Sequence, residues 1–469
     1  MSRQKCPRSS FWDLLGDLLM PVLKLLSPPE LHKLSLVNKE SRASCEPLLY
    51  SSIEWTWLED QPPPIVPFIR TILQRPELAA HVRRVSLLGD SFIPYFEDRN
   101  IVPPRIDVAT LEYYDIAKFM EQTKADFVSS WKKAFSQGSM DALITLLLFR
   151  LHHVTHIDLG PMFTFETGLL RQLFYSALLK NGDDQVPAYQ GLSKVHINFS
   201  ARLGRTRYSL ESADLLPFFY LPGIKELFVV SSMPMCWMDW PMQAPTSSML
   251  TTLHLTAVEP QHLGHLLSKT PALKKFRYDW YYRSGVDLRR PEEGSVWVSL
   301  DDIGSALQHV GETLEDLVIS GRCSIEEDYE YDFLDFQGTL KGIVGLGCLK
   351  SLQIPLPFLT GNFDSHNAVT VDDIIPRNLE ILTITDDVLL EWPWEPEWDD
   401  TTVSSAFKRW LRNLTSARAE PVLRTLVLKE AVKEWSSVMK EDLSQACRHY
   451  GLELRVTSLL TEGPPWVYP

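Results

Sequence analysis

A short apolar pattern, L-x-x-L-x-L, recurs through most of the chain and limits the possible folds more than any other feature. Each copy has three apolar positions, followed by turn residues and usually by a stretch of helical character. The clearest copies begin at Leu250, Leu273, Leu314, Leu349, Leu379 and Leu423. Weaker copies begin at Val82, Val154, Leu192 and Ile224. About ten such segments in one chain indicate a repeated structural unit.

The unit reads as a strand, a turn and a helix. Helix candidates between the apolar segments lie at 261–269, 303–310, 404–414 and 440–450. One strand and one helix cannot bury their apolar sides alone, whereas stacked copies form a parallel sheet over a continuous core. The sequence therefore predicts an α/β solenoid, a parallel sheet lined by helices. The alternative is an ordinary α/β domain whose strands happen to share the pattern.

The spacing of the copies links them to a known repeat class. Leu250 and Leu273 begin copies at a period within the 20 to 29 residues or so of leucine-rich repeats, but the next copy begins only at Leu314. The step from Leu379 to Leu423 is also long, and the usual asparagine or cysteine after the third leucine is mostly missing. The array resembles the divergent leucine-rich repeats of large receptor-like adaptors, with inserted loops.

Composition along the chain predicts four zones. A leucine-rich helical segment at 11–57 is followed by a proline-rich linker at 58–80, which contains Pro62, Pro63 and Pro64. The repeat array spans 81–458 and carries a helical insertion at about 107–150, where apolar residues recur at helical spacing. A tail at 459–469 completes the chain.

The N-terminal segment has more leucines than it can bury. One broad helical face carries Leu18, Leu19, Val22, Leu23 and Leu26. Ser27 is placed to cap a second helix that has Pro28 near its first turn. That helix and the turn after it add Leu31, Leu34, Leu36 and Val37. Because so small a segment cannot hide all of these side chains, a partner is expected to cover part of its apolar surface.

These residues resemble an F-box, without gaps, from Leu14 to Lys39, and Pro47 to Tyr50 match the end of its third segment. Leu15 stands where the family has a proline, Ser41 where a tryptophan is common, and Pro21 interrupts the first helix. The resemblance implies that the nine apolar residues named above bind a Skp-type adaptor and, through it, a cullin scaffold. An F-box followed by leucine-rich repeats implies a substrate receptor of a Skp-cullin-F-box ubiquitin ligase, which recruits an unknown protein substrate.

Two other functions stay open at this stage. The N-terminal helices can instead be a cap for the array, since terminal repeats need a polar-faced lid, and the protein is then a leucine-rich-repeat scaffold with no ubiquitin-ligase role. An enzyme is the third possibility, and it requires a pocket in which titratable groups converge.

Composition narrows the class of partner and the compartment. Asp and Glu total 60 against 46 Lys and Arg, a formal net charge of -14, which repels nucleic acids. The six cysteines lie far apart without a CxxC pair, which favours a reducing compartment, cytoplasmic or nuclear. Asp13 and Asp17 interrupt the would-be signal sequence. The longest strongly apolar run, 142–149, is far shorter than the roughly 20 residues of a membrane span, so no membrane contact is expected.

Residues with chemical potential are few, and none forms a catalytic motif. No G-x-x-x-x-G-K-[ST], G-x-S-x-G or H-E-x-x-H motif occurs, so no enzymatic activity and no cofactor are expected. A cluster of Gly342, Gly345 and Gly347 lacks the order of a nucleotide-binding fingerprint. The histidine groups 152–156 and 262–265 lack the ligand set of a metal site, and no metal is expected.

Target binding is expected on the face of the sheet that the helices leave free. Residues between the leucines point to that face, and the neighbouring copies place His254, Thr256, Lys275, Arg277 and Asp279 there. Two acidic, aromatic-rich stretches at 326–333 and 391–400 fall in repeat insertions. They are interpreted as solvated loops; the alternative is that their aromatic side chains hold a basic partner.

Overall fold

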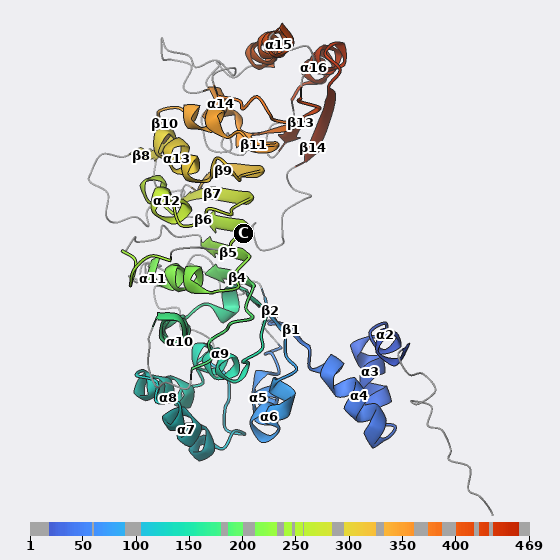
Figure 1. The fold of residues 1–469 in the computed structure, drawn as a ribbon, viewed down its shortest axis with the longest axis vertical. Helices are drawn as coiled ribbons and strands as arrows, with labels where there is room; N and C mark the ends of the chain where they lie inside the picture. The colour runs from blue at the N-terminus through green and yellow to red at the C-terminus, as the bar shows by residue number, and fades with distance from the viewer. Residues whose placement is uncertain are drawn as a thin grey trace, which may run out of the picture.

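The computed structural model describes residues 18–58, 61–89, 105–179, 186–199, 212–231, 239–245, 249–256, 258–283, 295–324, 333–360, 374–386, 400–416, 422–430 and 435–458. It is a mixed α/β fold built on one open, twelve-stranded parallel sheet with helices packed against it (Figure 1). Leu15, the tail 459–469 and most of both acidic, aromatic stretches lie outside the described residues.

All eleven neighbouring strand pairs in this sheet are parallel, and the strand order follows the chain. The strands are β1 (Ser52–Thr56), β2 (Arg84–Leu88), β3 (His156–Leu159), β4 (Lys194–Phe199), β5 (Glu226–Ser231), β6 (Thr252–Thr256), β7 (Lys275–Arg283), β9 (Asp316–Ser324), β11 (Ser351–Pro355), β12 (Ile381–Thr385), β13 (Thr425–Glu430) and β14 (Glu453–Ser458). A separate two-stranded parallel sheet pairs β8 (Ser295–Ser299) with β10 (Phe333–Gln337).

Helices connect most of the strands. The α-helices are α2 (Leu19–Leu23), α3 (Pro28–Ser35), α4 (Lys39–Leu49), α5 (Ile65–Gln74), α6 (Pro76–Ala79), α7 (Tyr113–Gln122), α8 (Val128–Ser136), α9 (Met140–Arg150), α10 (Gly168–Leu179), α11 (Ser212–Leu215), α12 (Pro260–Leu267), α13 (Leu300–Leu307), α14 (Leu356–Thr360), α15 (Asp400–Ser416) and α16 (Ser437–His449). Short 3₁₀ turns are η2 (Pro161–Phe163), η3 (Leu216–Tyr220), η4 (Gln308–Val310) and η5 (Lys341–Gly345).

The three apolar positions of the sequence pattern form three buried rows that cross the strands. In the copy that starts at Leu250, all three apolar side chains are fully buried, and the copies from Val82 to Leu423 are buried at the same positions. The register places the middle residues of neighbouring copies opposite each other, as with Leu253 and Phe276. Each such side chain contributes about 1.5–3 kcal/mol of hydrophobic free energy when buried, so the pattern accounts for the stacking.

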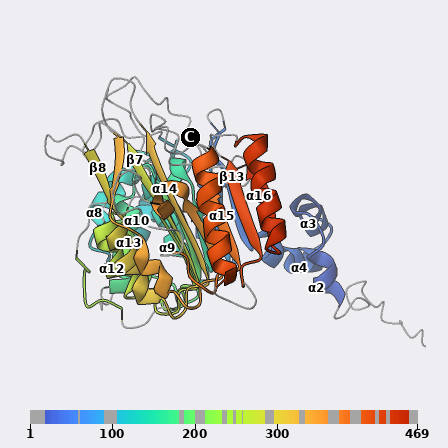
Figure 2. The same ribbon diagram turned by 90° about the horizontal axis from the view of Figure 1, so that it is seen from above.

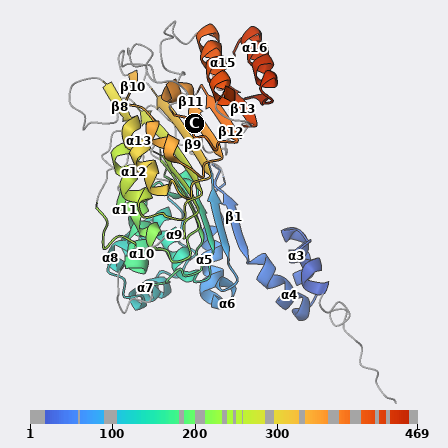
Figure 3. The same cartoon turned by 45° about the horizontal axis from the view of Figure 1, so that its top comes forward.

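The sheet has one covered face and one open face. In Figure 3, α10, α12 and α13 lie along one side of the strands, and none of the described helices lies over the middle of the other side. The covered face holds the apolar rows, which form one core cluster with the buried residues of the helices. Viewed from above, α15 and α16 continue the helical layer beside β13 at the C-terminal end (Figure 2). The residues between the leucines therefore face the open side, as the alternation of strands predicts.

The expected insertion at 107–150 is helical. Helices α7, α8 and α9 fill it, and they lie between β2 and β3 in the chain. Their aromatic residues pack into the main core, where Trp131 is fully buried and its indole N–H donates to the carbonyl of Ala142 over 3.0 Å. The insertion thus extends the core below the first strands.

The range 58–80 differs from the expected linker. It holds α5 and α6, and Ile65, Ile69 and Ile72 on α5 are completely buried. The prolines at 62–64 come directly before α5, where a residue without an N–H leaves no helical hydrogen bond unmade. The proline run therefore marks the start of a packed helix. The preceding segment also differs, because its helices end at Leu49 and β1 joins the sheet.

The N-terminal helices α2, α3 and α4 form a small unit beside β1 (Figures 1 and 3). Leu23, Leu31 and Cys45 make its own core, which is separate from the main one. Ser27 is the N-cap residue of α3, as expected, and its N–H and hydroxyl donate to Glu30 over 2.8 and 2.7 Å. Pro21 lies in the first turn of α2, a position that tolerates proline.

The glycine cluster 342–347 has a packing role that generates the first prediction. A Cβ atom on Gly342 would lie 2.5 Å from the carbonyl oxygen of Gly304 on α13. Gly342→Ala is therefore expected to lower the free energy of unfolding by about 1–3 kcal/mol, because backbone must move apart. The measurement is the urea midpoint followed by circular dichroism.

The matched control is Gly347→Ala, since a Cβ atom there meets nothing within 4 Å. Its free energy of unfolding should stay within about 0.5 kcal/mol of the parent protein. Equal midpoints for the two variants would show that the contact between α13 and η5 does not require a glycine.

Candidate functional site

The five residues expected to bind a target lie together on the open face. They occupy neighbouring strands, where the register places His254 opposite Arg277 and Thr256 opposite Asp279. Lys275 begins β7 beside Thr252 of β6. The sequence pattern therefore located these side chains correctly in the sheet. Burial and hydrogen bonding determine which of them can contact a target.

Asp279 is the centre of a buried polar network. His254 Nε2 lies 2.6 Å from Asp279 Oδ2, and Arg277 Nε lies 2.8 Å from the same oxygen and 3.1 Å from Oδ1. The hydroxyl of Ser320 on β9 donates to Oδ1. Asp279 thus joins three strands, β6, β7 and β9, by side-chain hydrogen bonds.

This network controls the ionisation of Asp279. Burial alone would raise the pKa of the carboxyl group, but the hydrogen bond and charge of His254, followed by the charge of Arg277 and the hydroxyl of Ser320, lower the pKa well below its usual range. The carboxylate is therefore charged at neutral pH, and its partners compensate for the loss of water.

Burial changes the expected roles of three of the five residues. His254, Thr256 and Asp279 are less than a tenth exposed. Thr256 exchanges hydrogen bonds with the backbone of Ser231, to whose carbonyl its hydroxyl donates over 2.7 Å. Polar groups on adjacent strands have satisfied one another, so these three hold the sheet together. Lys275, which is exposed, and Arg277, which is half-buried, are left to contact a target.

The same face carries residues that the sequence did not single out. His196 on β4 stacks on Phe228 of β5, with ring centroids 4.1 Å apart and ring planes 6° apart, and the edge of His254 follows at 5.4 Å. Glu226 accepts from Lys194 at 2.9 Å and contacts His196 Nε2 at 2.8 Å. All of these except Glu226 and Lys194 occupy the position between the second and third apolar residues of a copy, so that position was the signal.

The pKa of Glu226 shows the balance of forces at this point of the face. Burial raises the pKa of its carboxyl group, but the hydrogen bonds and charges of Lys194 and His196 together lower the pKa by more, so it lies below its usual range. Glu226 is therefore paired with a cation on the strand before it, whereas the half-buried Asp158 of β3 accepts from Ser86 and burial raises its pKa.

The network does not have the arrangement of a nucleophile and a base. Ser320 donates its hydroxyl to Asp279 and not to the imidazole of His254, so His254 is not placed to accept its proton. Among the described residues, no group of three or more His, Cys, Asp or Glu is gathered tightly enough to hold a metal ion. The polar network is accounted for by its structural bonds.

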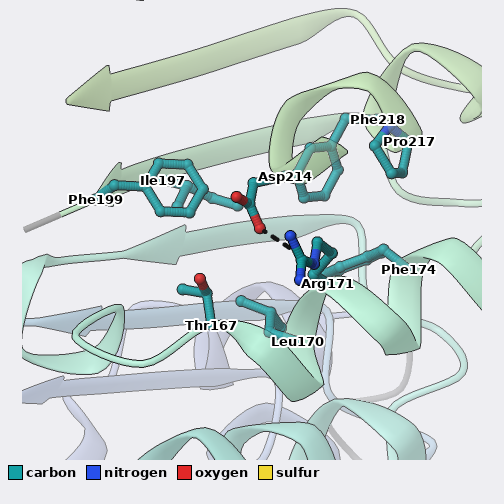
Figure 4. Close-up of a pocket in the computed structure, with 9 residues that line it drawn as sticks. All are labelled: Thr167, Leu170, Arg171, Phe174, Ile197, Phe199, Asp214, Pro217 and Phe218. Atoms are coloured by element: carbon teal, nitrogen blue, oxygen red, sulfur yellow. Dashed lines mark ion pairs between the residues drawn. The ribbon is translucent and has the colours of Figure 1, made fainter. Parts of the chain in front are cut away.

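A small pocket on the helical side of the sheet contains titratable side chains (Figure 4). Apolar side chains make up most of its wall, and Arg171 and Asp214, which pair at 3.8 Å, are its titratable members. Asp141 lies nearby, and burial raises its pKa to about 7. Both oxygens of Asp141 accept backbone N–H groups, from Leu169 and Leu170, so this carboxyl group caps α10.

The second candidate surface is on the N-terminal helices. Six of the sixteen exposed large apolar residues of the described chain fall within twenty residues of sequence: Leu18, Met20, Val22, Leu25, Leu36 and Val37. We call this set the apolar patch. A cluster of this kind on a small helical unit is typical of a protein-binding surface.

The apolar patch and the expected adaptor-binding residues overlap only in part. Leu18, Val22, Leu36 and Val37 are exposed, but Leu23 and Leu31 are buried at 1% and 5% exposure in the small core. Leu19, Leu26 and Leu34 are half-buried and pack against that core. These five residues form or line the small core of the unit. Met20 and Leu25 are exposed members of the apolar patch that the sequence pattern did not identify. A leucine-rich helix needs both an inner and an outer face, which the sequence alone did not separate.

Asp279 generates the second prediction. Asp279→Asn is expected to lower the free energy of unfolding at pH 7 by about 3 kcal/mol, because it removes the charge that His254 and Arg277 share. The folded-state pKa is lowered, so this stability is present above the ordinary aspartate pKa of about 4 and is lost as the pH falls below it. Urea unfolding between pH 7 and pH 3 should show the difference between parent and variant shrinking with acid.

Asp316→Asn is the control for this experiment. Asp316 lies on the neighbouring strand β9 and forms no ion pair with any described residue. The control variant should unfold like the parent at every pH. A loss for Asp279→Asn that does not change between pH 7 and pH 3 would contradict the role given to the charge.

Comparison with known proteins gives no family for this chain. No protein-family model matches the sequence, and no curated protein matches it either. Within the described residues, no helix combines the length and apolar character needed to cross a bilayer. The described chain offers two surfaces for a partner, the apolar patch and the open face of the sheet.

Proposed function

We propose that the chain is a non-catalytic adaptor, the substrate receptor of a Skp-cullin-F-box ubiquitin ligase. In this proposal α2, α3 and α4 are an F-box-like unit that binds a Skp-type adaptor, and the sheet with its helices is a divergent leucine-rich-repeat array that holds the target. The receptor needs no active site, because a charged conjugating enzyme supplies the ubiquitin and the receptor contributes proximity.

The observation that supports the proposal most is the apolar patch. Leu25 is 85% exposed, Leu36 is 71% exposed and Val37 is 68% exposed, on a unit whose own core is already complete. Burial of such side chains in an interface removes apolar area from water and stabilises the complex. The patch lies on helices that stand outside the main core, so a partner can reach it (Figure 3).

The repeat interpretation rests on the sheet. Parallel strands follow each other in chain order, and ten of the twelve, β2 to β7, β9 and β11 to β13, belong to units whose three apolar positions are buried. Such an array gives a long open face on one side, which is the surface that repeat proteins use for protein partners. The competing function, a scaffold without a ligase role, shares this array and differs only in what the apolar patch binds.

The third prediction tests the adaptor. Val37→Asp is expected to weaken capture of purified Skp adaptor by the full chain at least about ten-fold, since a charge in the apolar interface loses its hydration. Pull-down or titration calorimetry with the adaptor measures the loss. The unfolding midpoint of the variant should match the parent, because Val37 is outside the small core.

Val438→Asp is the matched control, because Val438 is also well exposed, at 77% against 68% for Val37, but lies on α16 at the other end of the chain. It should bind adaptor as the parent does. If the parent chain itself captures no adaptor, the ligase proposal fails and the scaffold function takes its place. Leu31→Asp separates folding from contact, since it should disrupt the small core and reduce helicity as well as binding.

A further inference from the structure

The edge of the sheet where the strands begin carries an excess of positive charge. Each strand starts with two residues whose N–H groups donate to one carbonyl of the strand before, so these pairs line up across the sheet. Lys225 shows the pattern, because its carbonyl accepts from Thr251 and Thr252 over 2.9 and 3.0 Å. From β2 to β7 the cations at these positions are Arg83, Arg84, Lys194, Lys225, Lys274 and Lys275, which we call the basic rim.

The basic rim is positively charged, whereas the chain as a whole is negatively charged. Its six cations face a single carboxylate at the equivalent positions of β2 to β7, that of Glu226. The full chain has 60 acidic and 46 basic residues, a net charge of -14. A local excess of cations on an acidic protein is an electrostatic feature that favours a negatively charged partner at this edge.

Half of the basic rim has no partner within the described chain. Lys194 pairs with Glu226 at 2.9 Å and Lys274 pairs with Glu315 at 3.0 Å. Arg83 donates to the carbonyls of Ala80 and Val82. The other three members are exposed and form no ion pair or side-chain hydrogen bond with any described residue: Arg84, Lys225 and Lys275. These three are spread over β2, β5 and β7, so they cover the length of the rim.

The histidine within the rim responds to this positive charge. His156 begins β3, between Arg84 of β2 and Lys194 of β4. Burial lowers the pKa of its imidazole, and the charges of Lys194 and Arg84 lower the pKa further. An anion bound at this point would relieve the repulsion between these groups.

The length of the basic rim sets the size of the partner. Neighbouring strands lie about 4.8 Å apart, so the five steps from β2 to β7 span roughly 24 Å. An extended peptide covers that distance with about seven residues. The next strand, β9, begins with Glu315 and Asp316, which bound the rim on that side. A long polyanion such as nucleic acid would extend past the rim onto these carboxylates, whereas a segment of about seven residues fits within the rim.

We propose that the basic rim binds a short acidic peptide segment of the target protein, with glutamate or aspartate carboxylates on Arg84, Lys225 and Lys275. This inference deepens the proposed function by giving the chemistry of the target. Peptide binding is measured without adaptor, so a failure to bind the peptide is distinct from a failure of the ligase proposal.

The fourth prediction compares two triple variants of the full chain. Arg84→Glu/Lys225→Glu/Lys275→Glu reverses the free cations of the rim. Lys118→Glu/Lys341→Glu/Arg409→Glu makes the same change of net charge at exposed cations of α7, η5 and α15 that have no ion pair in the described chain. The probe is a fluorescent peptide of about eight residues with alternating glutamate and glycine. Fluorescence anisotropy at low salt gives the dissociation constant for each chain.

The rim variant is expected to bind the peptide at least about ten-fold more weakly than the parent, and the control variant no more than about two-fold more weakly. Added salt should weaken binding by the parent, because the contacts are exposed ion pairs. Equal binding by the two variants would overturn the proposal. So would equal binding of a glutamine-glycine peptide, or tighter binding of a single-stranded oligonucleotide of equal charge. Capture of Skp adaptor by the rim variant should be unchanged.

Discussion

The sharing of apolar side chains between successive units is the constraint on which the structure depends. Each strand places leucines or their equivalents on one face, and these are buried only because the strands before and after supply the neighbouring side chains. Leu253, for example, lies in register between Leu227 and Phe276. If one unit lost its pairing with the units on either side, its apolar side chains and those of both neighbours would be exposed to water. The pattern must therefore persist along the chain. The long insertions are tolerated because they enter and leave between units.

The open face follows from the same geometry with the opposite chemistry. Parallel strands in register bring polar residues of neighbouring units within hydrogen-bonding distance, and none of the helices in the described part of the chain covers them. Asp279 meets His254 and Ser320 for this reason, and Glu226 meets Lys194. The carboxylates of Asp279 and Glu226 are paired on this face, while Arg84, Lys225 and Lys275 at the starting edge are exposed. The face therefore separates into a paired interior and a cationic edge.

The sequence predicted the parts of the fold that depend on local pattern. Ten strands of the large sheet, β2 to β7, β9 and β11 to β13, coincide with the apolar segments, because the spacing of three leucines determines both the strand and its buried face. The sequence pattern did not predict β1, β14 or the pair β8 and β10. The linker at 58–80 was wrong, because a proline run looks the same whether it precedes a helix or separates two domains, and only the packing of Ile69 decides between them. The network around Asp279 could not be derived, because 41 residues separate it from Ser320 and their contact depends on register. The difference in burial between Leu23 and Leu36 has a similar cause. Leu23 of α2 is buried because it packs in a core with Leu31 of α3 and Cys45 of α4, whereas Leu36 lies outside that core.

The join between the N-terminal helices and the sheet determines how the two proposed surfaces can act together. Arg75 at the end of α5 holds Glu46 of α4 through two hydrogen bonds of 2.8 and 2.9 Å, and Arg42 contacts the same carboxylate at 2.7 Å. The hydrogen bond from Arg75 lowers the pKa of Glu46 to about 2, despite an opposing effect of burial, so the bond is ionic at neutral pH. Phe68 adds an aromatic contact to both Tyr50 and Trp55. Because α5 is itself anchored in the main core by Ile65 and Ile69, a partner on the apolar patch is held at a defined position relative to the open face. A receptor that works by proximity requires such a fixed distance, since a flexible tether would dilute the target over a larger volume.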